Sequence, residues 1–208
     1  MPTSTFDPSN QDNIDRKIAF GFERIAQVLK TLIWSESKES GLSPIQIQFL
    51  IALAFNSHRD WTVSDLAAYF QLTPATVSDA LTALEEKDLL VRRQSKEDKR
   101  VSNIVLTAAG RRQALKLAGW MNAIQDEVAR LDADSKATML HALMNMIASL
   151  QQKGLISVVQ MCMTCTYFRP NAHPGKSKPH HCAYIDMAFG DADLRLDCPD
   201  YARKEAEG

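Results

Sequence analysis

The chain has 208 residues and a formal net charge of −1 at pH 7, so its overall charge does not mark it as a partner of nucleic acid or of a membrane surface. Its length provides one ordinary domain and a smaller appendage. No apolar run reaches the length of a membrane span, and the N-terminus lacks the basic-then-apolar pattern of a signal peptide. We therefore expect a cytoplasmic protein without membrane contact.

The first part of the chain predicts an arm followed by two helices. Residues 1–11 contain two prolines among polar neighbours and are expected to form a flexible arm. Apolar residues then recur at helical spacing to about Lys38, and Gly41 ends the predicted helix. A serine–proline pair at 43–44 predicts the start of a second helix that runs to about Asn56.

Two short helices are predicted next. Thr62 and Asp65 have capping-box spacing, which predicts a helix to about Gln71, and Thr73 before Pro74 predicts the start of another. The second helix turns apolar residues inward, namely Val77, Ala80, Leu81 and Leu84. It turns small or polar residues outward, namely Ala75, Thr76, Ser78, Asp79 and Thr82. This is the helix-turn-helix plan, whose second helix fits the major groove of B-DNA, so the expected DNA contacts here are Thr73 and the outward residues.

A charged hairpin is predicted directly after these helices. Leu89–Val91 and Val101–Leu106 are strand-like, and the turn at Gln94–Lys99 is too polar to be buried. The hairpin carries five basic residues and two acidic ones: Arg92, Arg93, Lys96, Lys99 and Arg100 against Glu97 and Asp98. Such a run is usually a solvated tip. After a helix-turn-helix we interpret it as a wing that lies along phosphates or enters the minor groove.

These residues resemble the MarR family of winged-helix transcriptional regulators over roughly residues 12–153, with 62–107 as the winged helix-turn-helix core. The resemblance rests on Leu66-Ala67, Thr76-Val77-Ser78, Leu84-Glu85, Leu89–Val91, Asp98–Arg100, Leu106-Thr107 and Gly110. It implies that Asp98 and Arg100 match a wing-bracing aspartate and an arginine that reaches DNA. It also implies a homodimer that binds a pseudo-palindromic double-stranded operator.

Three positions depart from the family pattern. Asp79 stands where members commonly carry a basic residue, Ala83 where another is frequent, and Asp88 where a glycine is usual. An aspartate cannot neutralise a phosphate, although it can accept from a cytosine amino group. We therefore expect an altered operator preference and retained DNA binding.

Two long helices are predicted after the hairpin. Thr107 is the expected cap of a helix from Ala108 to about Leu131, and Asp134 the expected cap of the next, which ends near Gln152. Their apolar residues exceed what a monomeric hairpin would hide: Leu115, Leu117, Ile124, Val128, Leu140, Leu143, Met144, Ile147 and Leu150. Intramolecular packing is the alternative to a dimer interface.

The resemblance also implies a pocket for a small aromatic effector between the dimerisation helices and the DNA-binding lobe. The candidate lining residues are Trp34, Phe49, His58 and Trp120. Each is more commonly a core residue or a singly exposed one.

All the cysteines lie in residues 154–208, at Cys162, Cys165, Cys182 and Cys198, with the spacing C-x2-C-x16-C-x15-C. A reducing cytoplasm disfavours structural disulfides. The segment begins with a predicted strand at Leu155–Met161 and is otherwise short of apolar residues, so a bound metal would supply folding energy. We interpret it as a cysteine-rich metal-binding module.

Three occupants of the four-cysteine site remain open. Zinc is the first choice, because a CxxC knuckle completed by two cysteines is a common structural zinc site. An iron–sulfur cluster is second, since all-cysteine ligation, a single knuckle and the final Cys198-Pro199 suit it. A metal-free thiol switch is third. His173, His180 and His181 are candidate substitutes or orienting residues.

The sequence thus predicts a mainly α protein with a small β-hairpin wing (α+β), long dimerisation helices and a small C-terminal cysteine module. The expected function is a homodimeric, sequence-specific DNA-binding regulator, a repressor that responds to metal or redox state. A permanently occupied structural site is the alternative to sensing.

No catalytic set can be argued from the residues, so an enzyme is not expected. Two alternatives remain. A thiol-disulfide oxidoreductase would place its CxxC at a helix start beside a βαβ pattern, which this sequence lacks. A non-DNA interaction protein on the same scaffold is favoured only by Asp79 and the near-neutral charge.

Overall fold

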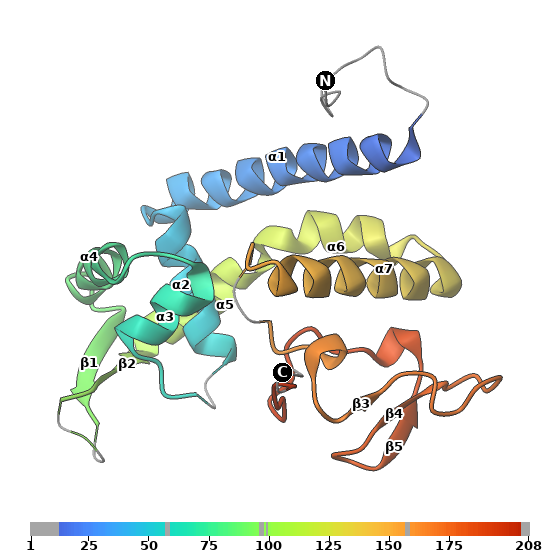
Figure 1. Ribbon diagram of the computed structural model, residues 1–208. Helices are drawn as coiled ribbons and strands as arrows, with labels where there is room; N and C mark the ends of the chain where they lie inside the picture. The colour runs from blue at the N-terminus through green and yellow to red at the C-terminus, as the bar shows by residue number, and fades with distance from the viewer. Residues whose placement is uncertain (1–12, 57–58, 96–97, 99, 157–158, 205–208) are drawn as a thin grey trace. The chain divides into compact units, whose positions relative to one another are not determined.

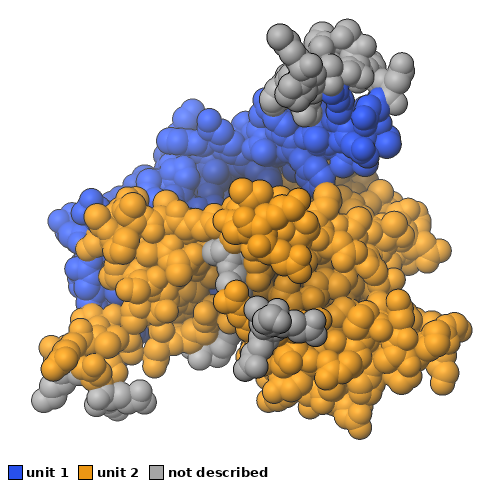
Figure 2. All heavy atoms as spheres, viewed as in Figure 1, with its two compact units in different colours: residues 1–57, 79–93, 104–123 blue, residues 58–78, 94–103, 124–208 orange. Residues whose placement is uncertain are grey.

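The computed structural model describes residues 13–56, 59–95, 98, 100–156 and 159–204. The arm predicted at 1–11 lies outside these residues. The chain divides into two compact units (Figure 2). Unit 1 contains residues 1–57, 79–93 and 104–123, and unit 2 contains 58–78, 94–103 and 124–208.

Unit 1 is mainly helical (Figure 1). Its complete elements are α1 (Ile14–Ser40), α2 (Pro44–Phe55), α5 (Ala108–Leu117) and the 3₁₀ turn η1 (Ala118–Met121). It also contains most of α4 (Pro74–Glu85) and parts of the hairpin strands β1 (Leu90–Gln94) and β2 (Ser102–Leu106). Helix α2 packs against α1 and α5, and its Ile47, Phe49 and Leu50 are fully buried.

The predicted ends of α1 and α2 are confirmed. Gly41 closes α1 with φ 67°, a left-handed conformation that glycine adopts without a Cβ penalty. Ser43 and Gln46 form a reciprocal capping box at the start of α2, with Pro44 in the first turn. Each signal acts over three residues or fewer, so it was readable from the sequence.

Unit 2 contains α3 (Val63–Phe70), the start of α4, and a long α7 (Ala133–Gln152). The helix α6 (Asn122–Ala129) belongs largely to it. The C-terminal segment, defined here as residues 159–204, adds two 3₁₀ turns and three short strands: η2 (Cys162–Thr164), β3 (Phe168–Arg169), β4 (His180–Cys182), β5 (Met187–Phe189) and η3 (Asp191–Asp193). The strands form an antiparallel sheet in the order β3-β4-β5, with Phe168 opposite Cys182 and His180 opposite Phe189.

Two predictions for the long helices were wrong in detail. The helix expected from Ala108 to Leu131 is divided into α5 and α6 by η1, which contains Gly119, and glycine is a weak helix former. The cap of α7 is Asp132, whose side chain accepts the N–H of Ser135. Asp134, the expected cap, lies inside the first turn.

The strand predicted at Leu155–Met161 is absent from its described residues. The N–H of Met161 bonds to the carbonyl of Val159, which makes a tight turn there, and Gln151 accepts the N–H of Val159. Met161 is fully buried. The apolar pattern therefore reflects a turn that buries Met161 and not pairing with another strand.

The described structure is mainly helical with small antiparallel sheets, as the sequence predicted. No described helix combines the length and the apolar character needed to cross a membrane.

Candidate DNA-binding surface and four-cysteine cavity

Helix α4 separates its side chains as the sequence predicted. Val77, Leu81 and Leu84 are fully buried, and Ala80, also predicted to face inward, is half-buried. The outer positions Ala75, Thr76, Asp79 and Thr82 are exposed and Ser78 is half-buried. This leaves an outer face of small and polar groups, a surface that can approach base edges closely.

Thr73 holds the first turn of α4. Its hydroxyl accepts the N–H of Thr76 at 3.1 Å and lies 2.9 Å from the Thr76 hydroxyl. Before it, Gln71 ends α3 in the left-handed region with φ 53°. The capping box predicted for Thr62 and Asp65 is present at the start of α3.

The wing turn is organised by Asp98. Its carboxylate accepts the N–H of Arg100 at 2.9 Å, and its carbonyl accepts the N–H of Val101 at 2.9 Å. The N–H of Ser95 bonds to the carbonyl of Val101, which closes the turn. Asp98 therefore shapes the wing while the side chain of Arg100 is exposed. Lys96 and Lys99, predicted to bind DNA, lie outside the described residues.

Arg92 and Arg93 differ in their surroundings. The Arg92 guanidinium lies 3.3 Å from a Glu85 carboxylate oxygen and donates to the Thr82 hydroxyl at 3.1 Å. It therefore links β1 to α4. Arg93 is exposed on the next position of the strand. The sequence predicts both as wing residues that contact phosphates or the minor groove, and the structure gives Arg92 a bracing role in addition.

Asp88 stands before the first wing strand, where the resemblance implies a glycine. Its φ is 56°, in the left-handed region that aspartate tolerates better than most side chains. Its carbonyl accepts the Thr107 hydroxyl at 2.7 Å. The departure from the family pattern is therefore accommodated by the backbone.

The candidate effector residues differ in how far their side chains are buried. Phe49 is fully buried, whereas Trp34 is 49% exposed. Trp120 is half-buried in η1. His58 lies outside the described residues.

The four cysteines, by contrast, line one cavity of about 400 Å³ in the C-terminal segment. They are Cys162, Cys165, Cys182 and Cys198, and none forms a disulfide. The wall between them is largely apolar and includes Tyr167, Phe168, Tyr184, Ile185, Met187 and Phe189.

Three separate pieces of chain bring these cysteines together. Cys162 and Cys165 flank a tight turn in which the N–H of Cys165 bonds to the carbonyl of Cys162 at 3.0 Å. Cys182 is the last residue of β4. The N–H of Cys198 bonds to the carbonyl of Gln160 at 2.8 Å, which anchors the final cysteine beside the first pair.

Arg195 directs two donors at the cysteine sulfurs. Its backbone N–H donates to Cys162 Sγ at 3.3 Å, and its guanidinium lies 3.9 Å from Cys198 Sγ. Burial raises the pKa of the Cys162 thiol, against the lowering effect of the Arg195 N–H.

The candidate histidine substitutes do not line the cavity. Among the described residues, His180 Nε2 lies 2.9 Å from an Asp191 oxygen and His141 Nδ1 lies 2.6 Å from the same oxygen. The N–H of Asn171 donates to His180 Nδ1, so Nε2 carries the proton. The hydrogen bond from His180 holds the pKa of Asp191 low.

His181 and His173 form a second pair outside the cavity lining. His181 Nε2 lies 3.1 Å from Asp186, and its Nδ1 lies 3.2 Å from His173 Nε2. The sequence did not indicate His141 or Asp191, because these two residues are 50 positions apart.

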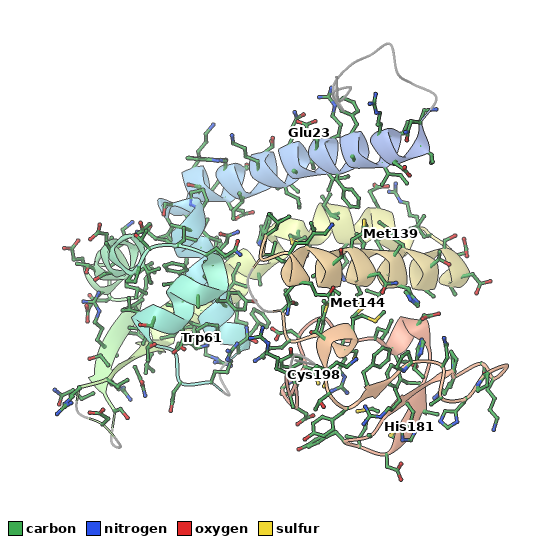
Figure 3. The ribbon with its side chains drawn as sticks, in the orientation of Figure 1. Glu23, Trp61, Met139, Met144, His181 and Cys198 are labelled. Carbon is green, nitrogen blue, oxygen red and sulfur yellow. The ribbon has the colours of Figure 1, made fainter. Side chains whose placement is uncertain are left out.

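The C-terminal segment packs on α7. Met144 of α7, labelled in Figure 3, shares a buried cluster with Met161, Cys165, Phe168 and Leu194. Leu140, Ile147 and Ala148 of the same helix surround this cluster. The four-cysteine cavity and α7 therefore share one core.

A polar-faced helix after a short buried helix, followed by a two-stranded hairpin, defines a winged helix-turn-helix protein. Residues 40–101 match the model of the MarR family. The structure is similar to Staphylococcus aureus MepR in its DNA-binding conformation, at 26% identity and TM-score 0.58, over 64% of this chain and 98% of that one. These matches agree with the resemblance to the MarR family read from the sequence, over residues 40–101 for the family model and over 64% of the chain for the MepR structure.

Two further structures of the same S. aureus protein are similar at 26% identity, over 64% of this chain and 97% of theirs. They are the MepR–DNA complex, with a TM-score of 0.56, and MepR described as a transcription regulator of the multidrug efflux pump MepA, with a TM-score of 0.51. A search of curated proteins found no match.

Proposed function

We propose that this chain is a sequence-specific DNA-binding transcriptional regulator, a repressor, that reads a pseudo-palindromic double-stranded operator as a homodimer. The observation that carries the proposal is α4, which buries Val77, Leu81 and Leu84 fully and carries small or polar groups on its outer face, followed by a wing shaped by Asp98. In this arrangement α4 enters the major groove and Arg100 reaches the adjacent backbone or minor groove.

The dimer is supported by an uncovered apolar stripe on α1. Five large side chains recur along this helix and are between 43% and 64% exposed: Ile14, Ile18, Phe22, Ile25 and Val28. Met139, Met146 and Leu150 of α7 are also exposed. Apolar stripes of this length favour a protein partner, and a second copy would provide the two-fold symmetry of a pseudo-palindrome.

We further propose that the four-cysteine cavity holds a metal centre, zinc or iron–sulfur, whose state regulates DNA binding. The support is its shared core with α7, the helix whose exposed side chains we assign to the dimer. A change at the cysteines that moves α7 would alter the separation of two recognition helices, and simultaneous fit to two half-sites is sensitive to that separation. A permanently occupied structural centre is the alternative.

Arg100→Ala is expected to weaken operator binding by about 5- to 150-fold, the equivalent of about 1–3 kcal/mol for an arginine in a specific contact. The operator would be selected from a random-sequence DNA pool and binding measured by fluorescence anisotropy. Ser78→Ala tests the helix in the same assay. Arg112→Ala, an exposed arginine on α5, is the charge-matched control and should bind like wild type.

Sedimentation would show whether Arg100→Ala remains a dimer, which separates lost DNA contacts from lost assembly. The non-DNA interaction protein would be favoured if no DNA sequence were enriched from the random pool and if any residual DNA affinity did not change with salt concentration. Small aromatic acids added to the same assay would test the effector that the family likeness implies.

Arg93→Ala should lower affinity for all DNA sequences alike and reduce the slope of log K against log salt by about 1, as expected for one lost phosphate contact. Arg92→Ala should instead lower the free energy of unfolding by up to about 1 kcal/mol, because its partners Glu85 and Thr82 lose an exposed bridge. Salt titrations and urea unfolding of both variants measure the difference. Identical behaviour of the two variants would contradict the bracing role of Arg92.

A further inference from the structure

The spacing of the four cysteine sulfurs constrains what the cavity can hold. Four sulfurs at about 2.3 Å from a tetrahedral zinc ion lie about 3.8 Å from one another. Within the described part of the chain, the single group of three His, Cys, Asp or Glu side chains whose ligand atoms lie within 4.8 Å of one another is His141, His180 and Asp191. No three of the four cysteine sulfurs come that close, although all four line the same cavity.

The cavity between the sulfurs is also large for one ion. Its volume is about 400 Å³, and aromatic and aliphatic side chains form most of its wall. An iron–sulfur cluster places several metal and sulfide atoms between its cysteine ligands, so the ligands surround a wider space than a single zinc ion requires. The apolar wall suits inorganic sulfide, which a zinc site does not contain.

Hydrogen-bond donors directed at the cysteine sulfurs also favour an iron–sulfur cluster. The Arg195 N–H bonds to Cys162 Sγ, and the Arg195 guanidinium lies near Cys198 Sγ. Hydrogen bonds and positive charge at ligand sulfurs stabilise the electron-rich thiolates of a cluster and raise its reduction potential. The single knuckle and the Cys198-Pro199 ending are likewise typical of cluster ligation.

We propose that Cys162, Cys165, Cys182 and Cys198 hold an iron–sulfur cluster in this cavity. The inference rests on the proposed four-cysteine metal centre and specifies its occupant. Cys162, Cys182 and Cys198 are each only half-buried, so the cluster is accessible to solvent and to small oxidants. The histidine–aspartate group does not compete for this role, because Asn171 donates to His180 Nδ1 and leaves Nε2 protonated towards Asp191.

The test is metal and sulfide analysis of the full chain purified without oxygen, together with its visible absorption spectrum. The expected sample is brown and contains about four iron and four sulfide per chain, or about two of each for a two-iron cluster. The metal-free chain would also be offered ferric and ferrous iron with sulfide, or zinc alone, under nitrogen. A colourless protein with one zinc per chain, and no cluster formed with iron and sulfide, would overturn the proposal.

The outcomes separate this inference from the proposed function. Stoichiometric zinc without a cluster leaves the metal centre standing and removes the cluster, whereas binding of neither metal removes both. Operator binding, measured in parallel, tests the DNA-binding proposal independently of either result.

Two variants test the ligands. Cys198→Ser should lose most of its iron and colour, and full retention would contradict the ligand assignment. Because a serine variant can fail to fold, Arg195→Ala provides a second test that keeps all four thiols. It should bind iron and show a more negative reduction potential, since a positive charge near Cys198 Sγ is lost. An unchanged potential would contradict the role of Arg195 at the cluster.

Discussion

Met144→Ala is expected to lower the free energy of unfolding of the C-terminal segment by about 2–5 kcal/mol, the usual cost of removing a buried methionine side chain. Met144 is fully buried, and it is the buried residue that α7 contributes to the cluster with Met161, Phe168 and Leu194. Truncation leaves a cavity at the junction between α7 and the segment. The segment should therefore become susceptible to proteases while α1 and α2 remain folded.

Limited proteolysis with mass spectrometry, and thermal unfolding followed by circular dichroism, measure this effect. Thr138→Ala is the control, because this residue is exposed on the same helix and belongs neither to the buried cluster nor to the side chains assigned to the dimer. This variant should change the free energy of unfolding by no more than about 0.5 kcal/mol. Sedimentation of both variants separates any loss of dimer. Equal protection of the C-terminal segment in both variants would contradict its attachment through Met144.

Gly110→Ala is expected to destabilise the winged helix-turn-helix by about 1–3 kcal/mol or more, as for other overpacked sites. A Cβ at this position would lie 1.7 Å from the carbonyl oxygen of Leu89 and 2.7 Å from its carbonyl carbon. Both are backbone atoms, so the clash cannot be relieved by a side-chain rotation. The same carbonyl accepts the N–H of Thr107, which ties the start of α5 to the residue before β1.

Urea unfolding measures the stability of this variant, and operator binding measures displacement of the wing. Gly21→Ala is the matched control, since nothing lies within 4 Å of the added methyl group. In the helix α1 it should stabilise by up to about 1 kcal/mol, because alanine is the better helix former. A Gly110→Ala protein as stable as wild type would show that the backbone at Leu89 can yield.

Local signals were sufficient for much of the DNA-binding region. The capping boxes at Ser43 and Thr62, and the left-handed Gly41, depend on residues within one helical turn, and the structure contains each of them. The inward and outward faces of α4 follow from helical spacing alone. The DNA contacts predicted for α4 and the wing all remain predictions, and two of these residues, Lys96 and Lys99, also lie outside the described chain.

Local signals failed where two similar choices competed. Asp132 and Asp134 are both suitable residues to cap α7. In the structure the cap is Asp132, whose side chain bonds to the N–H and the hydroxyl of Ser135. The break at η1 and the turn before Met161 were also missed. In each case an apolar or helical pattern continues through a point at which backbone geometry changes, so periodicity alone does not mark the boundary.

The sequence by itself determined the winged-helix plan, the polar face of α4 and the presence of four cysteines in one segment. Only the tertiary structure decided that these cysteines line one cavity, that His180 turns to Asp191 and His141, and that the segment shares its core with α7. The physical reason is how many residues separate the contacting side chains along the chain. A cap or a helix face is set by neighbours three or four residues away, whereas the cavity joins cysteines up to 36 positions apart, from Cys162 to Cys198, through packing that no local pattern encodes.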